Sequence, residues 1–179
     1  YVDRRELKMN EKFSIKDKEG KEVGLQVEAF EVPGKIALWL EDETKGDDFG
    51  SEDGDTIGLR IFSSNNDKSF FYIPACAKMT NQLAKKIEGS EIVLFDGTLW
   101  KNDEMASSKV GEKTGQRMGH MNNSGSDGSI EAFKNLGVKR KVFIHINTTN
   151  PILLGDSEER KIVEENGWEV SYDGMEINL

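Results

Sequence analysis

Two uninterrupted apolar runs constrain the fold of this chain more than any other feature of its sequence. They lie within the segments EIVLFDGT (91–98) and KRKVFIHIN (139–147), and in both segments polar residues follow the apolar run. A continuous apolar run of this length is typical of a strand that is fully buried in a sheet. Such strands are covered by helices, so we expect helices next to them in the sequence.

Three helices are predicted around these strands. Their ranges are 80–89, 128–137 and 156–167. Thr80 and Ser129 stand at the N-cap positions of the first two helices, and Asp156 forms a capping box with Glu159 at the start of the third. The C-terminal half of the chain therefore alternates strand and helix.

The N-terminal part of the chain has the pattern of antiparallel strands. Apolar and polar residues alternate in two predicted hairpins, and a third hairpin about Asp173 and Gly174 closes the chain. The three hairpins cover residues 8–34, 56–74 and 168–179. Together with the helices, they predict an α/β fold in which a sheet carries helices on its outer face.

The net charge and the cysteine content limit the partners and the cellular location that we expect for the protein. A net charge of −9 argues against nucleic acid or an anionic membrane as the partner. Segment 41–55 has eight acidic residues and one lysine, so it supplies −7 of this charge, and we expect it to be a solvated, mobile loop. The single cysteine, Cys76, favours a reducing, cytoplasmic location. No apolar run reaches the roughly 18–20 residues of a membrane span.

Ionisable residues gather at the predicted carboxyl ends of the strands, where open α/β sheets bind ligands. Asp96 and His145 end the two buried runs, and Cys76 follows a third predicted strand. His120 lies on segment 105–128, a glycine- and serine-rich stretch that is long enough to be a functional, active-site loop. We therefore expect one carboxylate, two imidazoles and one thiol to converge at this edge.

The residues alone leave a second interpretation open for each of these side chains. His145 could be a core histidine bound to a backbone carbonyl, and His120 a solvated loop histidine. Asp96 could simply form an Asx turn, and Cys76 could be a small buried hydrophobe. A metal needs three or four ligands, so these residues predict at most an incomplete metal site.

The same residues stand in motifs that resemble a known family. DGTLW (96–100), MGH (118–120) and HINTTNP (145–151), in this order, resemble the C-terminal portion of the PqqB family. These are pyrroloquinoline quinone (PQQ) biosynthesis proteins of the metallo-β-lactamase superfamily. The resemblance implies an αββα sandwich, of which residues 1–179 would form the C-terminal part. It also implies a missing N-terminal half with a structural zinc and further active-site ligands, and a chain that starts at Tyr1 fits this expectation.

The resemblance also implies roles for individual residues. His145 matches the last metal-ligating histidine of the superfamily. Asp96 and His120 match an acid–histidine pair beside the metal in its tRNA-processing and phosphodiesterase branches, so both are candidate catalytic residues and His120 is a second candidate ligand. Asn147 and Asn150 would support the ligands.

Cys76 stands where the resemblance implies a metal-bridging aspartate in the hydrolases of the superfamily. Cys76 is therefore a possible ligand, and the missing aspartate argues against a site with two metals. A single metal held by histidine and carboxylate suits Fe(II) and oxygen, with zinc as the other candidate.

For the function, the resemblance implies PQQ biosynthesis by a non-haem iron hydroxylase. The expected reaction is metal- and oxygen-dependent hydroxylation of a tyrosine-derived ring of the PqqA precursor, so the expected partner is a PqqA-derived peptide or amino acid. A homodimer stays open. The alternatives are a metallo-β-lactamase-type hydrolase or phosphodiesterase, and a non-catalytic carrier involved in transport of PQQ or its precursor.

Overall fold

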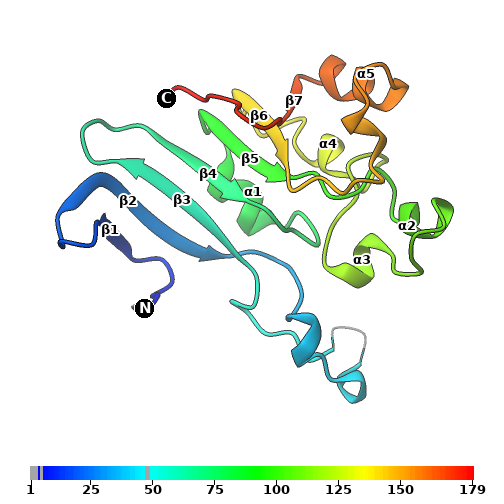
Figure 1. Ribbon diagram of the computed structural model, residues 1–179, viewed down its shortest axis with the longest axis horizontal. Helices are drawn as coiled ribbons and strands as arrows, with labels where there is room; N and C mark the ends of the chain where they lie inside the picture. The colour runs from blue at the N-terminus through cyan, green and yellow to red at the C-terminus, as the bar shows by residue number, and fades with distance from the viewer. Residues whose placement is uncertain (1–3, 5, 47–48) are drawn as a thin grey trace.

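The computed structural model describes residues 4, 6–46 and 49–179. Its strands form one seven-stranded sheet, in which the order of the strands in space equals their order in the chain (Figure 1). The strands are β1 Lys12–Lys16, β2 Glu22–Glu31, β3 Ile57–Ser63, β4 Ser69–Ile73, β5 Ile92–Asp96, β6 Arg140–Ile144 and β7 Trp168–Val170. The helices are η1 Leu38–Leu40, η2 Glu43–Lys45, α1 Asn81–Ile87, α2 Glu104–Ser107, α3 Gly115–Met118, α4 Ser129–Ala132, η3 Pro151–Leu153 and α5 Glu158–Glu165.

The sheet has an antiparallel half and a parallel half. Strands β1 to β4 pair antiparallel, and β4 to β7 pair parallel. Antiparallel neighbours need only short turns, whereas parallel neighbours need a crossover, which here contains the α-helices. The predicted α/β fold and both predicted buried strands are confirmed.

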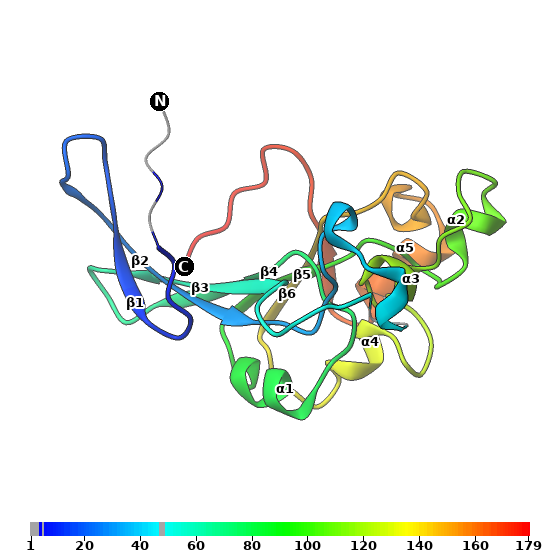
Figure 2. The same cartoon turned by 90° about the horizontal axis from the view of Figure 1, so that it is seen from below.

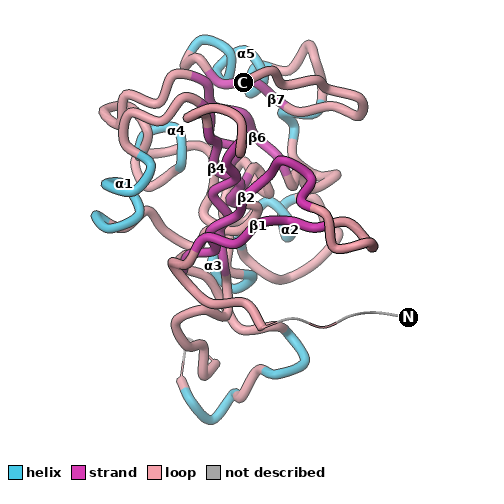
Figure 3. The backbone as a smooth tube through the Cα atoms, turned by 90° about the vertical axis from the view of Figure 1, so that its left-hand side faces the viewer, coloured by secondary structure: helices cyan, strands magenta, loops and turns pink. Residues whose placement is uncertain are grey.

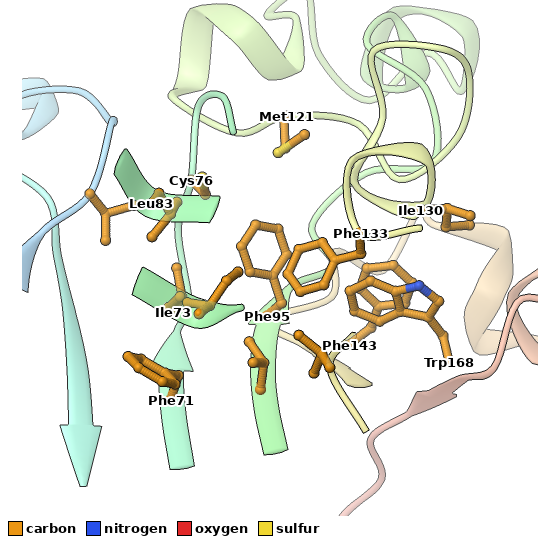
Figure 4. Packing of buried hydrophobic residues seen from close by; sticks show 14 of the residues in the cluster. Phe71, Ile73, Cys76, Leu83, Phe95, Met121, Ile130, Phe133, Phe143 and Trp168 are labelled. Carbon is orange, nitrogen blue, oxygen red and sulfur yellow. The ribbon is translucent and has the colours of Figure 1, made fainter. Parts of the chain in front are cut away.

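One face of the sheet carries the hydrophobic core. Helices α1 and α4 lie on this face (Figure 2), and alternate residues of the central strands point toward them. The Trp168 ring stacks on Phe143 with centroids 4.0 Å apart, and Phe133 meets Phe95 edge-on at 4.9 Å (Figure 4). Large aromatic rings thus close the layer between helices and sheet.

The opposite face of the sheet is apolar but less covered. The strand register places Phe13 beside Val27 and Tyr72 beside Leu59 on this face. The exposed fractions of Phe13 and Tyr72 are 40% and 36%, and Leu25 of the same face is 43% exposed. The two faces therefore differ in how completely their apolar side chains are buried.

The first predicted helix start is correct and the second is wrong. The Thr80 hydroxyl accepts a hydrogen bond from the Leu83 N–H at 3.2 Å, so Thr80 caps α1. Ser129, in contrast, is the first residue of α4, and Gly128 holds the N-cap position. A Cβ atom at Gly128 would lie 2.3 Å from the Ser124 carbonyl oxygen, so the close approach of the chain requires glycine there.

The capping box predicted at Asp156 and Glu159 is also wrong. Helix α5 begins one residue later, and the Ser157 hydroxyl accepts a hydrogen bond from the Arg160 N–H at 3.0 Å. The same hydroxyl donates to the Pro151 carbonyl at 2.8 Å. Aspartate and serine are comparable N-caps, and the contact with the preceding turn favours the serine.

The predicted C-terminal hairpin is wrong as well. Residues 171–179, all of which are described, contain a turn in which the Met175 N–H donates to the Tyr172 carbonyl at 3.0 Å, but they form no strand. In Figure 2 the chain after β7 arcs away from the sheet. The alternating residues after the turn therefore have no strand beside them to pair with.

The acidic segment 41–55 is part of the connection from β2 to β3, and it projects beyond the sheet (Figure 3). Its exposed acids are Glu43, Glu52, Asp53 and Asp55. Glu41 departs from the predicted solvated loop, because its side chain is 9% exposed and paired with Lys35 and Arg117. Residues 47–48 lie outside the described residues, and the mobility of the segment stays a prediction.

Segment 105–128 is built from short helices and turns. It contains the end of α2 and all of α3, and the Met121 N–H ties it to the Cys76 carbonyl at 2.7 Å. This contact brings the segment to the carboxyl edge of the parallel strands. Among the residues that the structure describes, no helix has the length and apolar character that a membrane crossing requires.

Candidate metal centre

Asp96 is the last residue of β5, and its side chain is fully buried. Its Oδ1 accepts hydrogen bonds from the Thr98 N–H at 3.1 Å and from the Thr98 hydroxyl at 2.5 Å. Its Oδ2 accepts from the Cys76 N–H at 3.0 Å. The bond to the Thr98 N–H is an Asx turn, so this alternative interpretation is correct, and the turn also holds the carboxylate at the strand edge.

His120 reaches the carboxylate from the turn after α3. Gly119 has a φ of 84°, which lets the chain reverse at the end of the helix. The His120 N–H donates to the Gly115 carbonyl at 2.9 Å, and its Nδ1 lies 2.7 Å from Asp96 Oδ2. The side chain is 13% exposed, so the alternative of a solvated loop histidine is wrong.

His145 directly follows β6 and has a φ of 52°, in the left-handed region that non-glycine residues rarely adopt. Such backbone conformations cluster at functional sites. Its Nδ1 lies 2.9 Å from Thr98 Oγ1 and 3.8 Å from Asp96 Oδ1. The side chain is 54% exposed, so the alternative of a core histidine is wrong.

Asp96, His120 and His145 together form a group with metal-ligand chemistry. One potential ligand atom of each residue lies within 4.8 Å of those of the other two. The two imidazole rings stack with centroids 5.2 Å apart and an interplanar angle of 21°. Imidazole and carboxylate are the ligand types that zinc and non-haem iron take, so the residues present fit such a metal.

Thr98 is part of this group and was missed by sequence reasoning. Its hydroxyl oxygen lies 2.5 Å from Asp96 Oδ1, 2.9 Å from His145 Nδ1 and 3.1 Å from His120 Nδ1. One hydroxyl therefore links the carboxylate to both rings. A signal was available, because an Asx turn folds the residue two positions later back over the carboxylate.

Cys76 lies beside the group but is turned away from it. The side chain is completely buried (Figure 4), and its thiol donates to the Lys78 carbonyl at 3.3 Å. Burial, and then the nearby charge of Asp96, raise the pKa of Cys76 to about 12. The backbone N–H of Cys76, rather than its sulfur, contacts the carboxylate.

Asn147 and Asn150 lie in the loop that follows His145. The side chain of Asn150 is buried, and its Nδ2 donates to the Gly97 carbonyl at 2.8 Å. Asn147 Nδ2 donates to Thr149 Oγ1 at 2.7 Å. The Asn150 bond connects the loops that carry Asp96 and His145, and the Asn147 bond lies within the second loop. Neither amide contacts an imidazole in the described hydrogen bonds, so a supporting role for both residues stays a prediction.

Glu104 is a second residue that sequence reasoning missed. Its carboxylate is buried and accepts hydrogen bonds from the Trp100 N–H and the Thr149 hydroxyl, both at 2.6 Å. It thereby ties helix α2 to the loop after His145. No sequence signal distinguishes Glu104 from an exposed acid at the start of a helix.

The electrostatic environment of Asp96, His120 and His145 indicates which of their atoms carry protons. Burial raises the pKa of Asp96, but the hydrogen bonds from His120 and Thr98 and the nearby His145 ring lower it by more, so the pKa lies below its ordinary value. The nearby Asp96 carboxylate raises the pKa of His145 against the opposing effect of burial. An ionised carboxylate only accepts hydrogen bonds, so Nδ1 of His120 carries a proton.

Residues 1–146 match the family description "Beta-lactamase superfamily domain". The coenzyme PQQ synthesis protein B of Gluconacetobacter diazotrophicus is 47% identical over 178 residues, which are 98% of this chain and 56% of that protein. The protein of the same name from Xanthomonas campestris pv. campestris is 46% identical over 179 residues, 100% of this chain and 56% of that protein. The chain thus spans about half the length of these relatives.

Solved structures agree on the fold. The 1.98 Å crystal structure of Zn²⁺-bound PqqB from Methylobacterium extorquens matches with a TM-score of 0.83 and 42% identity, over 96% of this chain and 54% of that chain. Unliganded yeast PDE1 matches with a TM-score of 0.54 over 94% of this chain and 48% of that chain, and at 13% identity it shares the fold alone. The predicted metallo-β-lactamase-like fold is confirmed. The chain therefore belongs to the beta-lactamase superfamily, within which it is homologous to the coenzyme PQQ synthesis B proteins.

Proposed function

We propose that the chain carries part of the metal site of a PQQ biosynthesis protein, with His120 and His145 as ligands and Asp96 as the residue that orients them. The observation that supports this best is the saturation of the Asp96 carboxylate by Thr98, Cys76 and His120. A histidine that binds a metal usually donates its other ring N–H to such a carboxylate. Asp96 is therefore the partner that ligating histidines require.

The proton positions leave one free nitrogen on each ring. His120 donates from Nδ1 to Asp96, as the 2.7 Å distance requires. The Thr98 hydroxyl donates to Asp96 at 2.5 Å, so its lone pairs accept the Nδ1 proton of His145 at 2.9 Å. In the neutral rings Nε2 is then unprotonated, and this is the atom with which each histidine would bind the metal.

We infer that the reaction is the hydroxylation of a tyrosine-derived ring from a PqqA-derived peptide or amino acid. Bound Fe(II) would supply the oxygen chemistry, and zinc is the other candidate, since the Methylobacterium relative is Zn²⁺-bound. His145 is the most exposed member of the group, so it lies on the side that substrate reaches. Asp96, ionised because of its lowered pKa, keeps the His120 ring in the ligating tautomer directly, and it acts on the His145 ring through the Thr98 hydroxyl.

A two-metal hydrolase has less support. Cys76 stands at the position where the resemblance implies a bridging aspartate, and its thiol is protonated, buried and bonded to the Lys78 carbonyl. A carrier function has no contact in its favour among the described residues. The cytoplasmic location, and a structural zinc outside this chain, stay predictions.

The test is the metal content of the protein expressed from the full reading frame that contains this sequence. The protein is prepared without oxygen, loaded with Fe(II), and compared with His145→Ala and with Thr148→Ala, an exposed neighbour that serves as the control. We expect one active-site iron in the wild type and in Thr148→Ala, and its loss in His145→Ala.

The other outcomes distinguish the alternatives. Two metals per active site would support the hydrolase instead. Unchanged metal content in His145→Ala would show that His145 is not a ligand and would favour the carrier. If iron binds as expected, mass spectrometry of a tyrosine-containing PqqA-derived peptide should then find an added oxygen only with Fe(II) and oxygen present.

A further inference from the structure

A buried cluster of charges joins the acidic segment to the loop that carries His120. The Glu41 carboxylate accepts a hydrogen bond from Lys35 Nζ, and it receives two parallel bonds from Arg117, at 3.0 Å from Nη1 and 2.7 Å from Nη2. The side chains of Lys35 and Glu41 are each 9% exposed. A two-pronged arginine–carboxylate pair fixes orientation as well as distance.

Phe49 closes this cluster from one side. Its ring centroid lies 4.1 Å from Lys35 Nζ and 3.7 Å from Arg117 Cζ, so both cations stand over the same ring. A cation over an aromatic face is attracted by the ring, so Phe49 helps to hold both cations in place. Glu41 and Phe49 both belong to the acidic segment, so the segment holds Lys35 and Arg117 from two sides.

Lys35 also contacts the end of helix α3 directly. Its Nζ donates to the Arg117 carbonyl at 2.9 Å, in the last turn of the helix. A Cβ atom at Gly119 would lie 2.8 Å from Lys35 Cβ, so the turn after the helix packs tightly against this lysine. The Lys35 N–H is itself held by Thr56 Oγ1 at 3.1 Å.

Only Gly119 separates the end of α3, which Lys35 contacts, from His120 of the metal group. His120 follows Gly119, and its N–H is bonded to the Gly115 carbonyl at the other end of α3. The position of the ring beside Asp96 therefore depends on how α3 is seated, and α3 is seated on Lys35 and Glu41. Exposed acids of the same segment, such as Glu43, have no comparable contact in the described hydrogen bonds and ion pairs.

We propose that the Lys35–Glu41–Arg117 cluster is a positioning device that holds His120 in its ligating place, so that the acidic segment controls the metal affinity of the site. This inference rests on the proposed function for its metal readout only. It assigns Glu41 and Arg117 as positioning residues, because neither contacts the metal group in the described contacts. Partners that hydrogen-bond a ligating histidine directly change metal affinity 10–100-fold, so a contact that acts through the backbone should lie at the lower end of this range.

The test compares Glu41→Gln and Arg117→Lys with the control Glu43→Gln in the protein expressed from the full reading frame. The first readout needs no metal: the side-chain NMR signal of the His120 Nδ1 proton, assigned by its loss in His120→Ala. We expect this signal to shift or broaden in Glu41→Gln and Arg117→Lys and to stay unchanged in Glu43→Gln. An unchanged signal in folded Glu41→Gln and Arg117→Lys proteins overturns the proposal.

The second readout is affinity for Co²⁺, which reports the ligand field by its visible absorption. We expect about a 10-fold weaker affinity in Glu41→Gln and no further weakening when Glu41→Gln is added to His120→Ala. An equal loss in both backgrounds contradicts positioning through His120. If wild type binds no Co²⁺ at this group while the His120 signal responds to Glu41→Gln, the proposed function fails and the positioning role stands.

Discussion

The two faces of the sheet are built from similar residue types but are buried to different extents. On the face under α1 and α4, Phe71, Phe95 and Phe143 are at most 2% exposed. On the opposite face, Phe13 and Tyr72 keep 36–40% of their surface exposed. The apolar side chains of the first face are buried in a hydrophobic core, while several of those on the second face are exposed to solvent.

This difference leads us to expect a cover on the second face. Large exposed apolar patches are rare on monomeric proteins and usually mark a contact. The relatives are nearly twice as long as this chain, which spans 56% of their length. In the αββα sandwich that the resemblance implies, a second sheet would pack here, and we propose this as the cover.

The largest expected effect is on the covered face. Phe95→Ala should lower the free energy of unfolding by about 3–5 kcal/mol, because it leaves a cavity beside Phe133 and Trp168. Leu94→Ala, one residue earlier on the opposite and half-buried face, should cost about 1 kcal/mol in residues 1–179. Urea unfolding measures both values, with Phe95→Leu as a milder variant if Phe95→Ala does not fold. Equal costs at the two positions would refute the difference between the faces.

A charge on the open face should sharpen the comparison. Tyr72→Lys should change the stability of residues 1–179 by less than about 0.5 kcal/mol, since the side chain is 36% exposed there. In the protein from the full reading frame, the same change should cost about 2–3 kcal/mol if the face is covered, because the charge is then buried without a partner. Thermal unfolding of both proteins tests this, and a small effect in both would mean that the face stays open.

The smallest effect concerns an ion pair on the open face. The hydrogen bond from Arg140, stronger than the opposing effect of partial burial, lowers the pKa of Glu169. The pair therefore adds stability above the ordinary pKa of glutamate, and this stability is lost as the pH falls through the lowered pKa. Since the Glu169 side chain is 44% exposed, Glu169→Gln should cost at most about 0.5 kcal/mol at pH 7.

Unfolding curves at pH 7 and pH 3 check this prediction. The wild type should lose slightly more stability than Glu169→Gln between the two pH values. A cost well above 1 kcal/mol at pH 7 would show that the pair is screened from water, and thus that this edge is covered.

The elements that sequence reasoning predicted correctly are those with a local cause. Thr80 lies three residues before the N–H that it caps, and the apolar runs of β5 and β6 need no knowledge of their neighbours. The convergence of Asp96 and His145 also follows, because adjacent parallel strands end at the same edge. The sequence also placed His120 on a loop long enough to reach this edge, but it did not predict the hydrogen bond between His120 and Asp96.

Several of the wrong or missing elements depend on contacts with residues outside their own helix, strand or segment. Ser157 rather than Asp156 caps α5 because its hydroxyl also meets Pro151. The C-terminal residues alternate as a strand should, yet no strand lies beside them. The buried Glu41 looks like every other acid of its segment until Arg117, 76 positions away, is placed next to it.

By itself, the sequence determined the buried strands, the position of the helices after β4 and β6, the edge where the ionisable residues meet, and the motifs shared with the PQQ synthesis relatives. These follow from patterns over a few residues, where backbone geometry and apolar periodicity act directly. Only the tertiary structure decided that Thr98 links both histidines to Asp96, that Cys76 turns its thiol away, and that Glu41 is buried against the loop of His120. Each of these outcomes depends on desolvation and hydrogen bonding between separate segments, which packing alone brings within reach.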